Sequence, residues 1–298
     1  MAKYLGEHPE IGMAARKEVH YFGTDLHPRM VRRKRLTRTL GRWDPGREAG
    51  AHEHYLRLFS AVQGRRRLGE ASVWYLYSRT AAVEIAEFAP DAQIIAMIRN
   101  PIEMLPSLHS QLVRVGIEPV EDFAEALALD EERERSGAPQ GFAPRSYRSA
   151  VRYSEQIKRY LDVFGTNNVS VILYEDFRDH TLDVYRRACR FLGVDSAFVP
   201  DLAVVNPNRR VRSRAVRRLI WQPPDALRRL LRSTVSQPTR IRIGAALKRW
   251  NTRPVRREPA PADVVRSLRP IVAEEADELG ALLGIDLSFW LEGSAPER

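Results

Sequence analysis

An arginine and a serine flank the point at which an apolar strand is expected to turn into a helix. Arg99 follows the apolar run 93–98, and Ser107 lies eight residues later, early in the expected helix 99–116. The carboxyl edge of a parallel sheet and the N-terminus of a helix both favour anions. An arginine fork and a serine hydroxyl are good donors to phosphate. The spacing therefore indicates a phosphate site, or else an arginine paired with a nearby carboxylate and a serine that caps the helix.

A second group of reactive side chains lies near the start of the chain, in the segment ARKEVHYF (15–22). We expect a short strand here, in which Glu18 and His20 point to one face and Lys17 and Val19 to the other. A carboxylate or an imidazole can remove the proton of an attacking hydroxyl or amine. The alternative is a solvated strand end at which His20 caps a turn.

Strand-like and helix-like segments alternate along the chain, which predicts an α/β fold with a parallel sheet flanked by helices. Apolar runs at 93–98 and within 168–177 predict buried parallel strands, and 68–72 a short strand or turn. Amphipathic spacing predicts the helices 1–9, 52–62, 78–90, 99–116, 121–137 (mostly solvated), 147–165, 182–194 and 261–284.

Composition narrows the classes of partner. The 298 residues carry a formal net charge of +10, which favours anionic partners. Nucleic acid is not expected, because the basic stretches lack interleaved aromatic residues and a recognisable reading helix. The single cysteine, Cys189, excludes a disulfide framework, fits a cytoplasmic location and is expected to be buried. No apolar run is long enough to span a bilayer, and Cys and His are too scattered for a metal site.

The pattern formed by Arg99, Pro101, Glu103 and Ser107 resembles the 3′-phosphate-binding motif of sulfotransferases that use PAPS (3′-phosphoadenosine 5′-phosphosulfate). Other stretches are similar to that family in the same order. They are HPEIGMAARKEVHYF (8–22), GEASVWYL (69–76), VILYEDF (171–177), FLGV (191–194) and LSFWLEG (287–293).

The resemblance implies a fold similar to that of P-loop nucleotide kinases, in one domain with a core at about 1–200 and a basic, partly irregular extension at 201–298. It implies transfer of a sulfuryl group from PAPS to a hydroxyl or amine of a small molecule or glycan, with a carbohydrate or lipid expected and no metal. Glu18 would be the general base and His20 its support, with Lys17 as the third member of the catalytic group. Arg99 and Ser107 would hold the 3′-phosphate.

A basic segment, 206–218, lies where the family has a mobile loop near the co-substrate. There, Arg210 and Arg212 could close over the 3′-phosphate or hold an anionic acceptor. A solvated basic helix is the alternative.

Two departures from the family pattern matter. Ala71 stands where heparan-type enzymes usually carry a lysine, which argues against a heparan-like acceptor. The family also has an apolar strand and a P-K-x-G-T-[TS] loop before the helix 1–9. We expect both upstream of Met1, so that the chain as given is truncated, binds PAPS poorly and transfers little or no sulfate. The missing strand would lie between or beside the strands at 93–98 and 169–173. A non-catalytic nucleotide-binding relative and a P-loop small-molecule kinase are the alternatives.

Overall fold

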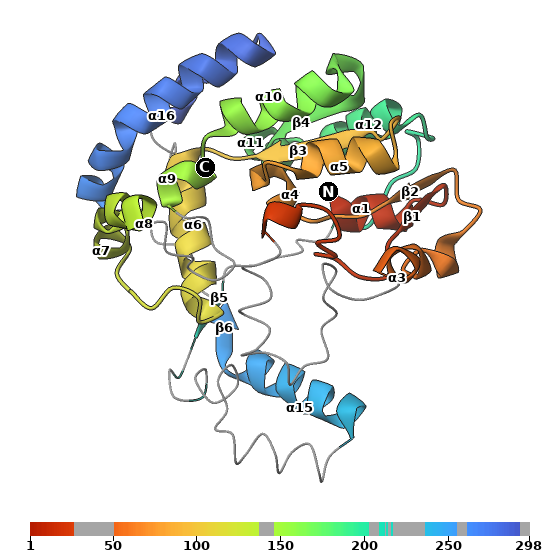
Figure 1. Ribbon diagram of the computed structural model, residues 1–298, viewed down its shortest axis with the longest axis horizontal. Coiled ribbons are helices and arrows are strands. Elements are labelled where there is room, and N and C mark those ends of the chain that lie inside the picture. The colour runs from red at the N-terminus through yellow and green to blue at the C-terminus, as the bar shows by residue number, and fades with distance from the viewer. Residues whose placement is uncertain are drawn as a thin grey trace.

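The computed structural model describes residues 1–26, 51–136, 146–202, 209–211, 213, 216, 236–254 and 261–292. Its elements alternate between helix and strand, as the sequence predicts for a mixed α/β fold (Figure 1). The helices are α1 (Ala2–Glu7), α3 (Ala51–Arg57), α4 (Trp74–Tyr77), α5 (Ala81–Phe88), α6 (Pro101–Arg114), α7 (Phe123–Ala128), α8 (Asp130–Ser136), α9 (Tyr147–Ala150), α10 (Tyr153–Phe164), α11 (Tyr174–Asp179), α12 (Thr181–Leu192), α15 (Gln237–Trp250) and α16 (Ala262–Leu283).

The strands of the described chain form three pairs. β3 (Ile94–Ile98) and β4 (Val169–Leu173) are parallel, with Ile94 opposite Val169 and Ile98 opposite Leu173. β1 (Ile11–Met13) and β2 (Arg67–Gly69) form a second parallel pair. β5 (Arg209–Val211) and β6 (Thr252–Pro254) are antiparallel. Because β3 and β4 pair directly, a further strand between them is excluded.

The largest part of the core lies where α6, α10 and α16 meet β3. Ile98, Leu105, Ile157, Leu268 and Trp290 are all at most 2% exposed in this cluster. Figure 1 shows α16 running alongside α10 at the outer edge of the fold. Residues 261–292 therefore contribute to the same core as the strands.

A smaller core joins the first helix to α12. Val184, Tyr185 and Cys189 of α12 are fully buried in the same cluster as Tyr4 and Leu5 of α1. Burial also raises the pKa of the Cys189 thiol above its ordinary value. The expectation that Cys189 is a buried packing residue is thus confirmed.

The segment 121–137 was expected as one mostly solvated helix; most of its described residues are exposed, but the single helix was wrong. The helix breaks at Leu129 into α7 and α8, and each buries a few residues on its inner face. Asp130 is 1% exposed and accepts hydrogen bonds from the backbone N–H groups of Tyr147 (2.8 Å) and Arg148 (2.9 Å). A buried carboxylate needs such partners, and these come from a segment 17 residues away.

The helix expected at 147–165 is likewise divided into α9 and α10. Ser146 and Ser149 form a capping box around α9, which ends at Val151. The backbone N–H of Ser154, in the first turn of α10, donates to the carboxylate of Glu275 on α16. The break therefore gives each short helix its own capped N-terminus.

Candidate active site

The segment 15–22 was expected to be a strand, and the structure shows irregular backbone instead; the strand is β1, a few residues earlier. Glu18 and His20 have φ angles of 55° and 54°, in the left-handed region that side chains seldom adopt. The backbone N–H of Glu18 donates to the carbonyl of Ala71 (2.9 Å), and that of His20 to the Ser72 hydroxyl (3.3 Å). A backbone carbonyl and a serine hydroxyl thus accept the hydrogen bonds that a neighbouring strand would otherwise accept from this segment.

The unusual backbone nevertheless brings Glu18 and His20 together. His20 Nε2 lies 3.4 Å from Glu18 Oε2. The same carboxylate oxygen accepts a hydrogen bond from the Val73 N–H (3.3 Å), at the start of α4. The side chain of Glu18 is 34% exposed and that of His20 15%, so the carboxylate borders solvent. Lys17 is exposed. An imidazole that orients a half-exposed carboxylate is a suitable arrangement for proton transfer.

A partly buried carboxylate that sequence reasoning did not single out lies beside this pair. Glu70 accepts hydrogen bonds from the hydroxyls of Ser72 (2.8 Å), Tyr75 (2.9 Å) and Tyr55 (3.2 Å). Burial raises the pKa of Glu70, while its hydroxyl donors act in the opposite direction. The only sequence signal for this group was the GEASVWYL stretch.

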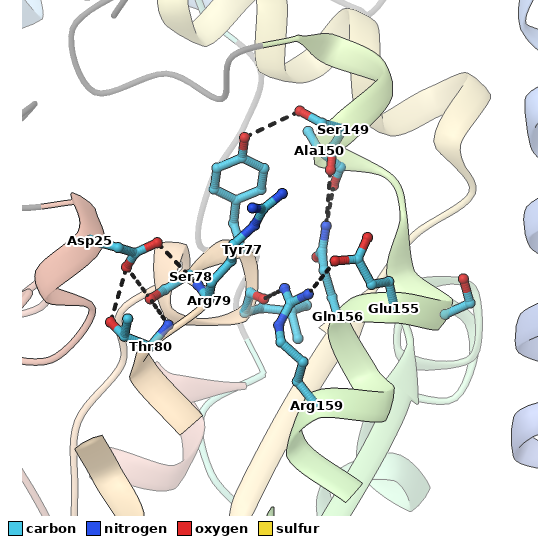
Figure 2. Close-up of polar contacts among 12 residues, drawn as sticks. Asp25, Tyr77, Ser78, Arg79, Thr80, Ser149, Ala150, Glu155, Gln156 and Arg159 are labelled. Atoms are coloured by element: carbon cyan, nitrogen blue, oxygen red, sulfur yellow. Dashed lines mark hydrogen bonds and ion pairs between the residues drawn. The ribbon is translucent and has the colours of Figure 1, made fainter. Parts of the chain in front are cut away.

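The chain beyond this segment is fastened to α4 and α5. Asp25 accepts hydrogen bonds from the Ser78 hydroxyl (2.5 Å), the Arg79 N–H (3.1 Å) and the Thr80 hydroxyl (3.2 Å), as Figure 2 shows. On the other side of α4, Tyr77 is hydrogen-bonded to Ser149 (3.2 Å). These hydrogen bonds hold the chain that follows the Glu18–His20 pair against the junction of α4 and α5, and α4 is in turn bonded to Ser149.

Arg99 lies at the carboxyl end of β3, as expected, and its guanidinium binds a carboxylate. Its Nε donates to Glu103 Oε2 (3.0 Å), and Nη2 contacts the same oxygen. The guanidinium also lies over the ring of Tyr174, 4.5 Å from its centroid. The side chain is 20% exposed. The carboxylate pairing that the sequence left open is therefore present, and a phosphate would have to compete with Glu103 for this cation.

Ser107 is the seventh residue of α6, and so lies in the second turn and not at the helix N-terminus. Its backbone N–H is therefore not among the first four that lack an intrahelical partner, and the hydroxyl is the group of Ser107 that could donate to an anion. Glu103 and Ser107 are one turn apart on the same helix face. The carboxylate that binds Arg99 and the Ser107 hydroxyl thus lie along one face of α6.

Asn100 joins three of the sequence stretches quoted above. Its side chain caps α6 by accepting from the Ile102 N–H (3.0 Å) and donates to the carbonyl of Trp290 (3.1 Å). Its own N–H donates to Glu175 (2.9 Å), in the YEDF stretch that follows β4. The sequence missed Tyr174 and Glu175 as neighbours of the arginine, although the motif that contains them was noted.

Of the two arginines singled out in the basic segment, Arg210 lies within the described residues. Arg210 lies in β5, which packs beside α6, the helix of Ser107. Arg212 lies outside the described residues.

Neither a metal cluster nor a membrane span is found in the part of the chain that the structure describes. No group of three or more His, Cys, Asp or Glu side chains could hold a metal ion there. None of the helices described combines the length and the apolar character needed to traverse a bilayer.

The comparisons with known proteins decide the family. No family model and no curated protein matches the chain. Among solved structures, the sulfotransferase from Alicyclobacillus acidocaldarius is similar, with 30% sequence identity and a TM-score of 0.64. The match covers 97% of this chain and 92% of that one. The chain belongs to the sulfotransferase family. The likeness supports a transferase, and the sulfotransferase expected from the sequence is confirmed at this level.

Proposed function

We propose that this sulfotransferase moves a sulfuryl group from PAPS to a hydroxyl or amine of a carbohydrate or lipid. The observation that carries the proposal is the 30% identity to a solved sulfotransferase over nearly the whole chain. The contact between Glu18 and His20 supports it, because sulfuryl transfer to a hydroxyl or amine requires a group that removes the acceptor's proton.

In this proposal Glu18 is the general base and His20 holds its carboxylate in place. The acceptor oxygen or nitrogen forms a bond to sulfur as Glu18 takes its proton. The bond from sulfur to the bridging oxygen breaks, and adenosine 3′,5′-bisphosphate leaves with the bonding electrons. Lys17 is kept as a third candidate, since its exposed ammonium is available to an anionic group.

Arg99 and Ser107 are proposed to bind the 3′-phosphate. A guanidinium held over an aromatic ring at the end of a strand, with a hydroxyl farther along the same helix face, offers donors that suit a phosphate. Glu103 opposes such binding as long as it holds the arginine. Arg99 must therefore exchange a carboxylate for the phosphate when the co-substrate binds.

The acceptor is proposed to be other than heparan, because Ala71 supplies no cation beside Glu70. Arg210 and Arg212 remain candidates for closing over the 3′-phosphate or for holding an anionic acceptor. The upstream strand and phosphate loop and the cytoplasmic location stay predictions.

The test is transfer of radiolabelled sulfate from PAPS to a panel of hydroxyl and amine acceptors, together with calorimetry of adenosine 3′,5′-bisphosphate and of ATP. We expect tighter binding of the bisphosphate than of ATP, and label in at least one acceptor when the phosphate loop expected upstream is present. Binding of the bisphosphate without any transfer would indicate a non-catalytic relative. Preference for ATP with Mg²⁺ would indicate a kinase.

A further inference from the structure

The partly buried carboxylate of Glu70, directly after β2, lies next to the segment that carries the proposed base. It is separated from that segment by two hydroxyl groups, those of Ser72 and Tyr75, and both hydroxyls donate to it. An ionised carboxylate can only accept hydrogen bonds, so the single proton of each hydroxyl must point toward Glu70.

The lone pairs of these hydroxyls consequently face the other way, toward backbone N–H groups. Ser72 Oγ accepts from the N–H of His20 (3.3 Å). The Tyr75 hydroxyl accepts from the N–H groups of Tyr21 (2.9 Å) and Phe22 (3.2 Å). Three consecutive N–H groups next to the Glu18–His20 pair are therefore bound by hydroxyls whose direction Glu70 sets.

These hydrogen bonds explain how residues 18–22 keep a backbone conformation with positive φ angles at Glu18 and His20. Left-handed φ angles at two residues that are not glycine cost free energy and persist only where surrounding contacts enforce them. Here the enforcing contacts come from a turn more than fifty residues away along the chain.

We propose that Glu70 is a positioning residue, which holds Glu18 and His20 in register for proton transfer by fixing the hydroxyl protons of Ser72 and Tyr75. The proposal rests on the proposed role of Glu18 as the base. In Glu70→Gln, the amide nitrogen must donate on one side of the group. The hydroxyl there loses the acceptor that fixed its proton, and it can accept from both the amide and the backbone N–H only with that proton unbound, which weakens its hydrogen bond to the segment.

Two tyrosines provide a matched pair of variants. Tyr55 and Tyr75 both donate to the same oxygen of Glu70, and the buried Tyr55 and the partly buried Tyr75 pack in one aromatic cluster. Of the two hydroxyls, that of Tyr75 also accepts from the segment's N–H groups. Tyr55→Phe therefore removes a hydrogen bond to Glu70 but keeps the ring that stacks on Tyr21, whereas Tyr75→Phe also removes an acceptor of the segment's N–H groups.

The first experiment follows hydrogen exchange of peptides spanning residues 16–22, which requires no activity. We expect exchange to be about tenfold faster in Tyr75→Phe and Glu70→Gln, because each loses hydrogen bonds to those amides, and to change less than twofold in Tyr55→Phe. Equal acceleration in the two tyrosine variants would overturn the proposal, because it would show general loosening of the cluster.

The second experiment separates positioning from catalysis in the full chain. For Tyr75→Phe and Glu70→Gln we expect kcat to fall about ten- to a hundredfold with KM for PAPS unchanged, since the base is displaced while the phosphate site at β3 is intact. If the wild type transfers sulfate and both variants have the same kcat as the wild type, the proposal is overturned. If the wild-type protein transfers no sulfate even when the expected upstream loop is present, the proposed function fails, and the exchange experiment alone decides the structural part. If Glu70→Gln does not fold, the hydrogen-exchange and kcat measurements are made on Tyr55→Phe and Tyr75→Phe alone.

Discussion

Glu275 provides a test of the link between burial and pH-dependent stability. It lies on α16 with only 4% of its surface exposed and accepts hydrogen bonds from the Ser154 N–H and hydroxyl at the start of α10. Burial, together with the nearby carboxylate of Glu278, raises the pKa of Glu275 from an ordinary 4.5 to about 7.

The sign of the effect follows from proton binding. Between about pH 4.5 and 7 the folded protein holds a proton on Glu275 that the unfolded chain releases, so the free energy of unfolding falls as the pH rises. The contribution is complete below pH 4.5 and is lost once the pH passes about 7. A raised pKa of this size corresponds to at most about 3 kcal/mol, at 1.36 kcal/mol for each pKa unit.

Glu275→Gln keeps the shape and removes the titration. Urea unfolding at several values between pH 5 and 8 should show the wild type losing about 2–3 kcal/mol relative to this variant across the range. Glu274→Gln, the same change at the exposed neighbouring position, should run parallel to the wild type. Parallel curves for Glu275→Gln as well would refute the reasoning, because they would mean that Glu275 titrates alike in the folded and unfolded states.

Three further predictions concern the proposed function. Arg99→Ala should weaken adenosine 3′,5′-bisphosphate by about 1.5–3 kcal/mol in calorimetry, the range for hydrogen bonds to a charged group, and adenosine 5′-monophosphate much less; equal losses would remove Arg99 from the 3′-phosphate site. Glu103→Gln should tighten the bisphosphate by about 0.5–1 kcal/mol, since it frees Arg99 from a competing carboxylate; weaker binding would show that Glu103 positions the arginine. Glu18→Gln should lower the rate of sulfate transfer roughly a hundredfold with unchanged bisphosphate binding, because an amide cannot take the proton; a near wild-type rate would point to His20 or another base.

The regular elements were predictable because their signals are local. Apolar runs of strand length mark β3 and β4, and helical spacing marks α12, which ends at Gly193 in the left-handed conformation that glycine tolerates. Proline at the first position of α6, after an asparagine cap, is likewise a local start signal.

The same locality explains what sequence reasoning missed. The segment 15–22 has a composition compatible with a strand, yet its N–H groups are taken by hydroxyls and a carbonyl more than fifty residues away. The breaks after α7 and α9 depend on Asp130 and Glu275, which bind N–H groups of other helices. The partners lie 17 residues apart for Asp130 and 121 residues apart for Glu275, beyond the reach of helical periodicity within one element.

The division is clearest at the candidate site. By itself the sequence determined that Arg99 would stand at the end of a strand, because the apolar run before it and the chain order fix that position. Only the tertiary structure decided that Glu18 and His20 meet through a left-handed backbone, that Glu103 holds the arginine and that the partly buried Glu70 binds the hydroxyls behind this turn. The physical reason is that a charged side chain takes whichever partner folding brings within hydrogen-bond distance, and spacing along the chain does not determine that choice.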